Sequence, residues 1–404
     1  MSLAHGRPYA AIPGPSVIPD RVLAAMHRPA PNIYGQALRE LTESLIPDLK
    51  RLARTAGHAA IYIGNGHAAW EAANANLFSR GDRALVPATG LFGLGWANSA
   101  ARMGVQAEVI DFGRSGPADP DRIEAALRAD RAGAIRAVMV THVDTATGVR
   151  NDLRAVRAAI DAAGHPALLV ADCIASLGCD RFLMDDWGVD VTLAASQKGL
   201  MTPPGLAILW MNDRALAATA AADLRTPYWD WRPRIAPEEY YQYFCGTAPT
   251  HHLFGLREAL TMILDEEGLE AVWARHERLA RAVWAAVGAW GGQGDIRLNV
   301  ADPAARGRSV TSVFVGGGGA ARLRAWTEAE AGVVLGIGLG MGTPEDPEAR
   351  DWLRVAHMGH VSAHMTLGVL AVMEAGLAAL GIPHGPGGAA AAAAAVAAGD
   401  APVA

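Results

Sequence analysis

The sequence predicts an α/β protein built on a doubly wound sheet. Short apolar runs, rich in β-branched residues, alternate with Ala- and Leu-rich stretches of helical length. This alternation is typical of a mainly parallel sheet that is covered by helices. The runs are apolar along their whole length, as expected for strands that are buried on both faces.

The first 211 residues supply the strands and helices of this sheet. Seven strands are expected, in chain order, at Ala59–Ile63, Arg83–Val86, Ala107–Phe112, Ala137–Thr141, Ala167–Ala171, Val189–Ala194 and Leu206–Met211. The helices expected between them cover Ala68–Phe78, Leu94–Met103, Pro120–Ala129 and Leu153–Ala163.

The chain changes character after Met211. An aromatic and Pro-rich stretch covers Tyr228–Tyr243, and a long helical pattern then covers His251–Trp290, with a break expected at Glu267-Gly268. A second group of strands, framed by helices, is expected at Ile296–Asn299, Ser309–Val315, Gly332–Leu335 and Trp352–Ala356. These patterns predict a smaller α+β domain of about a hundred residues.

We therefore expect an N-terminal arm over residues 1–20, a large domain over 21–265 and a small C-terminal domain over 266–386. The remaining segment, 387–404, is Ala-rich and follows a cluster of helix-breaking residues at Pro383–Gly388. We expect it to be a disordered or weakly helical tail that carries no chemistry.

Charge and cysteine content argue against several kinds of partner. The net charge of −6 disfavours nucleic acid. No uninterrupted apolar run approaches membrane-spanning length, so no membrane partner is expected. Cys173, Cys179 and Cys245 form neither a metal-type spacing nor an even set for disulfides. A cytoplasmic location and the absence of a metal site fit this pattern.

A carboxylate and an amine follow two apolar runs that would be neighbouring strands. Asp172 ends the run Leu169-Val170-Ala171, and Lys198 follows the run that ends at Ala195. A pyridoxal phosphate enzyme needs this pair, because the amine forms a Schiff base with the cofactor aldehyde and the carboxylate keeps the pyridine nitrogen protonated. Taken singly, Asp172 also fits a helix N-cap and Lys198 a snorkelling surface lysine. Their joint occurrence favours the cofactor site.

Three other strand ends carry candidate residues. Gly66 and His67 lie in a strand-to-helix turn whose amides can face a phosphate, although, taken alone, an ordinary tight turn explains them better. Phe92 can stack on a planar ring or fill a core. Thr145 and Thr147 place hydroxyls near a strand end, where capping and turn roles compete with a role in a site.

Further motifs accompany these residues in a fixed order. They are Pro13–Ser16, Gly64–His67, Thr141–Val149, Val170–Gly178, Asp185–Asp190, Ser196–Gly199, Pro203–Gly205 and Leu353–Gly359. Jointly the chain resembles the class V, fold-type I pyridoxal phosphate-dependent aminotransferases, and within them the alanine–, serine– and aspartate–glyoxylate group. The resemblance runs from about residue 10 to 385. It implies a mainly parallel seven-stranded large domain that binds the cofactor, and a smaller C-terminal domain.

The resemblance also implies roles for individual residues. Lys198 would hold the cofactor and move the substrate proton, and Asp172 would pair with the pyridine nitrogen. Arg354 would clamp the substrate α-carboxylate, with Gly14 and Tyr34 also near the substrate. The other residues implied to bind the cofactor are Gly66, His67, Phe92, Thr145, Ile174, Gln197 and, from the neighbouring subunit, Thr247.

The chain departs from the family pattern in three places. Phe244 stands where the family often has a phosphate-binding tyrosine. The segment Pro31–Gln36 lacks the His-Arg pair that family members often carry ahead of a phenylalanine, which suggests an unusual substrate. Arg232 and Arg234 lie in the aromatic stretch, where they either cover the site and hold a side-chain carboxylate or belong to an interface.

The expected reaction is a ping-pong transamination in a homodimer with shared active sites. Serine, alanine or aspartate would donate the amino group, and glyoxylate or pyruvate would accept it. Two enzyme alternatives remain open: a lyase of the same fold, and an aminotransferase of the pyridoxamine–pyruvate type. A non-catalytic protein that keeps the fold is disfavoured, because Lys198, Asp172 and Arg354 are all present.

Overall fold

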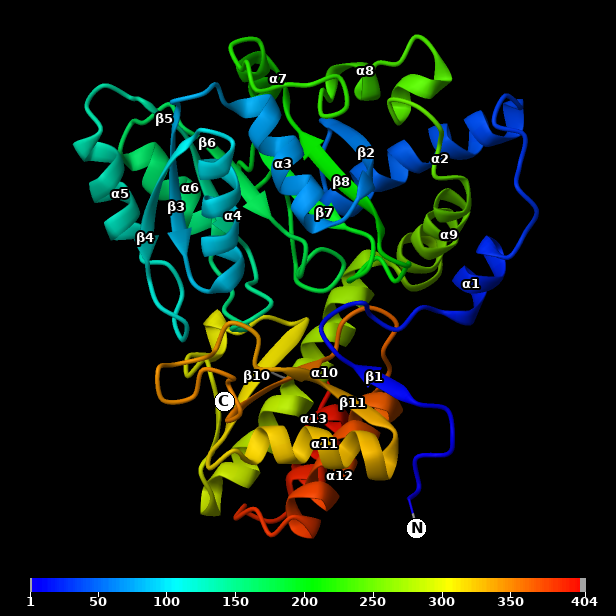
Figure 1. Ribbon diagram of the computed structural model, residues 1–404, viewed down its shortest axis with the longest axis vertical. Coiled ribbons are helices and arrows are strands. Elements are labelled where there is room, and N and C mark those ends of the chain that lie inside the picture. The colour runs from blue at the N-terminus through cyan, green and yellow to red at the C-terminus, as the bar shows by residue number, and fades with distance from the viewer. Residues whose placement is uncertain (1, 400–404) are drawn as a thin grey trace.

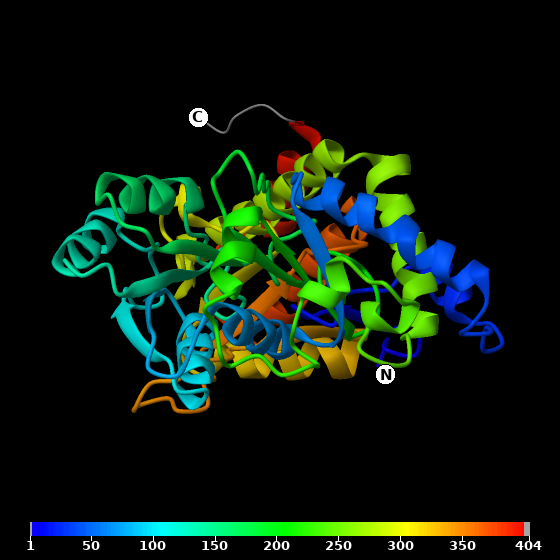
Figure 2. The same ribbon diagram turned by 90° about the horizontal axis from the view of Figure 1, so that it is seen from above.

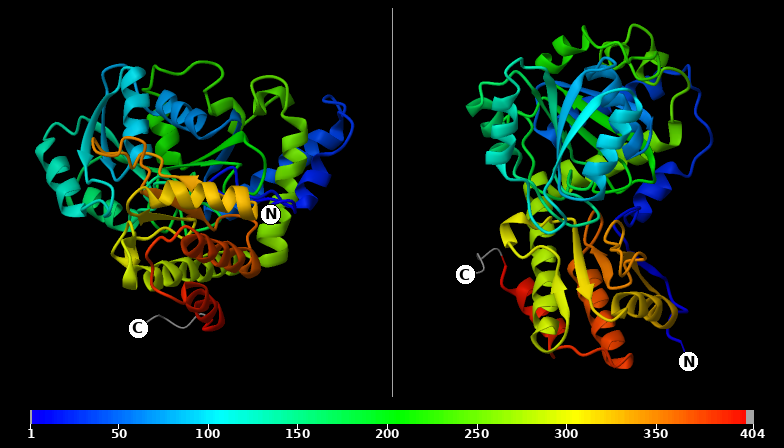
Figure 3. Two further views of the ribbon diagram at one scale, coloured as in Figure 1. Left: turned by 60° about the horizontal axis from the view of Figure 1, so that its bottom comes forward. Right: turned by 60° about the vertical axis from the view of Figure 1, so that its left-hand side comes forward.

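The computed structural model describes residues 2–399 and confirms the α/β class. It contains two sheets, one of seven strands and one of five, which lie one above the other in Figure 1. The right-hand view of Figure 3 shows the helix α10 (Leu269–Trp290) descending from the larger unit into the smaller one.

All seven predicted strands of the large sheet are present. Their order across the sheet is β2-β8-β7-β6-β5-β3-β4. β8 runs opposite to the other six strands of the sheet, so the carboxyl ends of those six meet at one edge. In Figure 1 the arrowhead of β3 points toward the small unit. The bounds are β2 His58–Gly64, β3 Arg83–Ala88, β4 Gln106–Asp111, β5 Ile135–Thr141, β6 Leu168–Asp172, β7 Val191–Ala195 and β8 Gly205–Met211.

Helices cover both faces of this sheet (Figure 2). Alternate residues of one strand enter two different cores: Val138 and Val140 of β5 join one cluster, and Ala137 and Met139 join the other. The four predicted helices are α3 Gly66–Leu77, α4 Leu91–Arg102, α5 Pro120–Ala129 and α6 Leu153–Ala162. The remaining helices of this unit are α1 Asp20–Met26, α2 Gln36–Ala53, α7 Asp213–Thr219, α8 Arg232–Ile235, the 3-10 helix Tyr240–Tyr243 and α9 Thr250–Leu260.

The small sheet has the order β1-β11-β12-β10-β9. Its edge strand β1 (Tyr9–Ala11) comes from the N-terminal arm and pairs in parallel with β11. The four predicted strands are present as β9 Ile296–Leu298, β10 Val310–Val315, β11 Val333–Ile337 and β12 Trp352–Ala356. They pack with α10, α11 (Gly319–Ala331), α12 (Ala363–Ala379) and α13 (Gly388–Ala397) into one apolar cluster.

The predicted break in the long helical segment is also present. A π-helical segment, Thr261–Glu267, follows α9, and Gly268 then adopts a φ of 83° before α10 begins. Glycine reaches this positive φ without the steric penalty that a Cβ would add. None of the described helices is long and apolar enough to cross a membrane.

Of the two alternatives expected for the tail, disorder is wrong and helix is correct for residues 388–397, which form α13. The helix packs on α10 and α12, with Ala392 fully buried. Glu374 accepts N–H groups from residues 387–389 and so caps its start. Gly388 lies so close to Trp290 that a Cβ there would be 2.0 Å from the indole nitrogen. The helix-breaking residues Pro383–Gly388 only reverse the chain direction, and the small alanine side chains then allow close packing. Residues 400–404 lie outside the described chain.

Two further sequence expectations differ from the structure. No helix was assigned to 36–53, yet α2 spans it with Pro47 inside, because a stripe that includes Leu38, Leu45 and Leu49 is buried in the core. The strand expected at 107–112 was read as buried on both faces, yet β4 is an exposed edge strand with Glu108 and Asp111 on it. Charged side chains at an edge discourage pairing with another chain.

Candidate active site

A cavity of about 300 Å³ lies at the edge where the carboxyl ends of the parallel strands meet. This is the expected place for a ligand in an open α/β sheet. The turn after β2, the start of α4 and the segments after β5, β6 and β7 all contribute to its walls. Nine of the predicted site residues line it: Gly14, Gly66, His67, Phe92, Thr145, Asp172, Ile174, Gln197 and Lys198.

Lys198 reaches the cavity from the turn that follows β7. Its side chain is buried, and Nζ donates a hydrogen bond to the Pro13 carbonyl. Burial, assisted by the charge of Arg354, lowers the pKa of the amine to about 8, while the Asp172 carboxylate acts in the opposite direction. Gly14 has a φ of 97°, and a Cβ on it would lie 2.8 Å from the lysine side chain. Only glycine therefore lets the arm approach Lys198 this closely.

Asp172 ends β6 and is buried, with 2% of its surface exposed. Its Oδ1 accepts the backbone N–H of Ile174 at 2.8 Å, and its Oδ2 accepts the indole N–H of Trp70 at 2.8 Å. Burial raises the pKa of this carboxyl to about 6, and the two donors hold it lower than burial alone would. At neutral pH the group is therefore mainly ionised.

The turn from β2 into α3 forms one wall of the cavity. Asn65 caps α3 by accepting the N–H of His67 at 3.1 Å. A Cβ on Gly66 would lie 2.7 Å from Cδ1 of Ile174, so the backbone here sits against the opposite wall. Two buried polar atoms of the cavity, Oγ1 of Thr141 and Oε1 of Gln197, have no hydrogen-bond partner among the described residues. Buried polar atoms in proteins normally have a partner, which a polar ligand or an ordered water can supply here.

The loop after β5 is organised by Asp144, which is completely buried. Its carboxylate accepts the N–H groups of Phe92 at 2.8 Å and Gly93 at 3.4 Å in the first turn of α4. It also accepts those of Ala146 at 2.9 Å and Thr147 at 3.3 Å in its own loop. One carboxylate thus joins the segment that presents Phe92 to the loop that presents Thr145. Burial raises the pKa of Asp144, and the four amides oppose that change.

Arg354 adjoins the cavity from β12 of the small sheet, and its side chain is buried. Nε donates to the Ile337 carbonyl at 2.7 Å, and Nη1 donates to the Thr145 carbonyl at 3.0 Å. Burial lowers the pKa of the guanidinium to about 10, so it stays charged at neutral pH. Both bonds go to backbone carbonyls, and no described carboxylate forms a salt bridge with it. Its charge remains available for an anion.

Comparison with known proteins identifies the family of the chain. The profile of the family "Aminotransferase class-V" matches residues 9–342. The chain belongs to the class V aminotransferases. Arg354 lies beyond the matched residues.

Characterised relatives of this aminotransferase cover nearly its whole length. It is 37% identical over 391 residues to serine–glyoxylate aminotransferase of Methylorubrum extorquens, covering 95% of this chain and 94% of that protein. It is 36% identical over 381 residues to L-aspartate–glyoxylate aminotransferase of Paracoccus denitrificans, covering 92% of this chain and 91% of that protein. Among solved structures, pyridoxamine–pyruvate aminotransferase of Mesorhizobium loti is 27% identical, with a TM-score of 0.87 and 98% of each chain covered.

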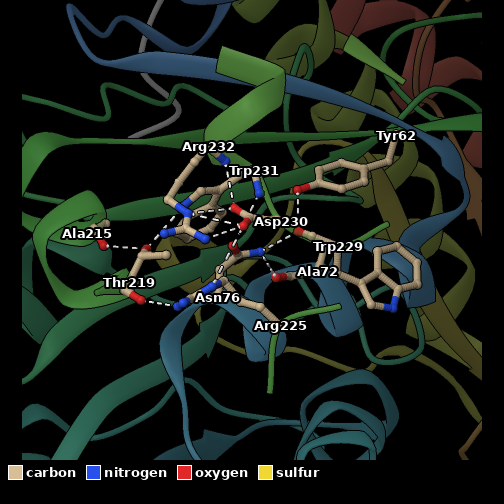
Figure 4. A network of polar contacts seen from close by, with 10 residues as sticks. All are labelled: Tyr62, Ala72, Asn76, Ala215, Thr219, Arg225, Trp229, Asp230, Trp231 and Arg232. Carbon is tan, nitrogen blue, oxygen red and sulfur yellow. Dashed lines mark hydrogen bonds and ion pairs between the residues drawn. The ribbon is translucent and has the colours of Figure 1, made fainter. Parts of the chain in front are cut away.

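Three predicted site residues, Tyr34, Thr247 and Arg354, are not among the described residues that line the cavity, and neither are Arg232 and Arg234. Arg354 contacts the cavity wall through its bond to the Thr145 carbonyl. Tyr34 is 92% exposed before α2, and Thr247 is exposed after the 3-10 helix. Arg232 pairs with Asp230, as Figure 4 shows. Arg234 is buried over the Tyr62 ring and donates to three backbone carbonyls. Neither arginine faces this aminotransferase's cavity, so the structure offers no support for their holding a substrate carboxylate within one subunit.

The sequence analysis missed two residues of the site, Trp70 and Asp144. Trp70 lies four positions after Gly66, which places both on one face of α3, and this spacing could have indicated it. Asp144 lies within the motif Thr141–Val149, where the hydroxyl groups of Thr145 and Thr147 are the candidates that the sequence suggests.

Proposed function

We propose that this aminotransferase uses pyridoxal 5′-phosphate to move an amino group from a small amino acid, serine, alanine or aspartate, to glyoxylate or pyruvate. The observation that carries the proposal is the buried pair of Lys198 and Asp172 in one cavity, at the ends of two adjacent strands. The named activities of the relatives support the choice of glyoxylate as an acceptor.

The cavity fits the cofactor. The buried, partnerless oxygen atoms of Thr141 and Gln197 supply polar groups that a bound ligand can satisfy. Gly66, His67 and Gln197 would hold the phosphate at the start of α3. Phe92 and Ile174 would contact the ring, Thr145 would lie near its hydroxyl, and Asp172 would pair with its nitrogen. When bound, pyridoxal phosphate supplies a protonated ring that accepts electrons from the substrate α-carbon.

Lys198 would act as the proton carrier. Because its pKa is lowered to about 8, a useful fraction of the amine is unprotonated near neutral pH. An unprotonated amine can bond to an aldehyde and can later accept a proton from the substrate α-carbon. The Pro13 carbonyl holds Nζ at the cavity wall.

Arg354 would bind the α-carboxylate of both substrates. An amino acid and a 2-oxo acid share this group, so one guanidinium can serve both halves of a ping-pong reaction. The cavity volume of about 300 Å³ suits small substrates once the cofactor occupies part of it.

We further propose a cytoplasmic homodimer in which Tyr34 and Thr247 reach the neighbouring subunit's site. Both side chains are exposed on the single chain, where a second subunit can reach them. The free cysteines Cys173, Cys179 and Cys245 suit a reducing compartment.

The test is a half-reaction followed by absorption. The enzyme is loaded with pyridoxal phosphate, and serine, alanine or aspartate is added singly without an oxo acid. The proposal expects one of them to bleach the visible band with release of its oxo acid, and glyoxylate or pyruvate to restore the band. The variant Lys198→Ala should show neither the band nor turnover.

Release of ammonia or sulfide instead would identify a lyase of the same fold. Failure to retain pyridoxal phosphate, together with conversion of free pyridoxamine and pyruvate into pyridoxal and alanine, would identify the pyridoxamine–pyruvate type, to which a solved structure of similar fold belongs.

A further inference from the structure

Two buried tryptophans lie side by side behind the site, one on α3 and one on α4. The rings of Trp70 and Trp96 are stacked, with centroids 6.2 Å apart and an interplanar angle of 10°. Both are almost completely buried. Their hydrogen-bond partners differ, because Trp96 donates to the Asn74 side chain at 3.2 Å, whereas Trp70 donates to Asp172 at 2.8 Å.

We propose that Trp70 is a positioning residue for Asp172, whose indole N–H fixes one carboxylate oxygen and keeps the shared proton on the cofactor nitrogen rather than on the carboxylate. This inference rests on the proposed function. Nothing in the family match or in the relatives' names assigns a role to this residue.

The surroundings of Asp172 show why the indole donor matters. Within the described residues, only the Ile174 amide and the Trp70 indole donate to this carboxylate. The Lys198 amine favours its ionised form, and Asp144 and burial disfavour it. The adjacent Cys173 thiol is buried, which raises its pKa well above its usual value, so it brings no charge. Loss of the Trp70 donor would leave Oδ2 of the buried Asp172 carboxylate without a hydrogen-bond donor from the described residues.

The direction of the effect follows from the chemistry of the pair. A donor to a carboxylate stabilises the anion and makes it a weaker base. Without the indole N–H, the carboxylate becomes a stronger base and draws the shared proton from the ring nitrogen. A neutral ring is a poorer acceptor of electrons, so proton removal from the substrate should slow while carboxylate binding at Arg354 is retained.

Trp70 also supports the cavity by shape. Its ring lies 4.6 Å from the His67 ring and 6.3 Å from that of Phe92, at an edge-on angle of 64° to the latter. A test must therefore separate the donor from the aromatic surface. The variant Trp70→Phe keeps a ring and removes the donor, and Trp96→Phe makes the same change one ring away, where the donor serves Asn74.

The experiment uses the full-length enzyme loaded with pyridoxal phosphate that carries ¹⁵N in the ring. Protonated and neutral pyridine nitrogens differ widely in ¹⁵N chemical shift, so NMR reports where the proton lies. We expect Trp70→Phe to move the signal toward the neutral position, with a shift of about tenfold in the proton distribution, and kcat to fall with little change in KM. Trp96→Phe should leave the signal unchanged.

The other possible results contradict either the proposed function or the inference about Trp70. If wild type takes up no cofactor, the proposed function fails. If wild type loads and Trp70→Phe gives its unchanged nitrogen signal, or if both phenylalanine variants shift equally, the inference about the indole donor is overturned. Should Trp70→Phe fail to fold, 3-benzothienylalanine at this position keeps both fused rings and replaces only the N–H by sulfur. The same shift is expected from it, and an unchanged signal would overturn the inference.

Discussion

Replacing Asp144 by asparagine tests how the two halves of the site wall are joined. Its Oδ2 accepts Phe92 N at 2.8 Å and its Oδ1 accepts Ala146 N at 2.9 Å. Asparagine keeps the shape but offers one oxygen and one NH₂ group. In Asp144→Asn, one of the two amides therefore faces a donor instead of an acceptor.

The magnitude follows from these contacts. A lost hydrogen bond to a charged group costs about 1.5–3 kcal/mol, and the amide left unpaired in the interior adds to this. Removal of a buried charge offsets part of the cost, since burial raises the pKa of Asp144. We expect a net loss of about 2–3 kcal/mol at this loop. Because Thr145 of the loop accepts Arg354 Nη1 at 3.0 Å, the KM for the amino acid should rise roughly tenfold.

A matched control exists at the start of α6. Asp152 is exposed and caps that helix by accepting Arg154 N at 2.9 Å and Ala155 N at 3.1 Å. Asparagine caps a helix about as well as aspartate, so Asp152→Asn should change nothing. Melting temperature and KM are measured for both variants. If Asp144→Asn melts and turns over like Asp152→Asn, this carboxylate does not hold the site together.

Three further outcomes are expected. The rate at which cofactor-free enzyme recombines with pyridoxal phosphate should rise with pH around a midpoint near 8, where Lys198 loses its proton. Because the charge of Arg354 lowers the pKa of Lys198, Arg354→Gln should move that midpoint upward. A midpoint that does not move contradicts this coupling. Steady-state kinetics of Arg354→Gln should show KM raised roughly 10–100-fold for the amino acid and the oxo acid alike, and an effect on one substrate alone would disprove a shared clamp. In thermal unfolding, Gly388→Ala should destabilise by displacing α13 from Trp290, whereas Gly368→Ala in α12, where a Cβ meets nothing within 4 Å, should be neutral or stabilising; equal melting would contradict the packing of α13.

The strands of the large sheet could be predicted because their signals are local. The predicted run Ala167–Ala171 is apolar throughout, and the structure buries every residue of the strand β6 that it forms. The break at Gly268 could be predicted for the same reason, since one residue type carries it. Lys198 and Asp172 were found because a charged residue that ends an apolar strand needs an explanation.

What the sequence could not show depends on partners distant in the chain. Nothing in the sequence near residues 388–397 reveals that the helix packs against Trp290 and is capped by Glu374. The indole of Trp70 and its acceptor are 102 positions apart, and the amide donors from α4 lie about 50 positions before Asp144. In the sequence, a residue such as Trp70 reads as an ordinary core residue. Only the folded arrangement shows that it contacts a residue of the site.

The arrangement of charges explains why the site can receive acidic ligands. Its two buried acids are satisfied by neutral donors: Asp144 by backbone amides, and Asp172 by an amide and an indole. Its two buried cations, Lys198 and Arg354, donate only to carbonyls in the hydrogen bonds described. If the acids lacked those neutral donors, each would draw a cation into a salt bridge, and a substrate carboxylate would have to displace it. The neutral donors therefore keep both cations free to act on a substrate carboxylate.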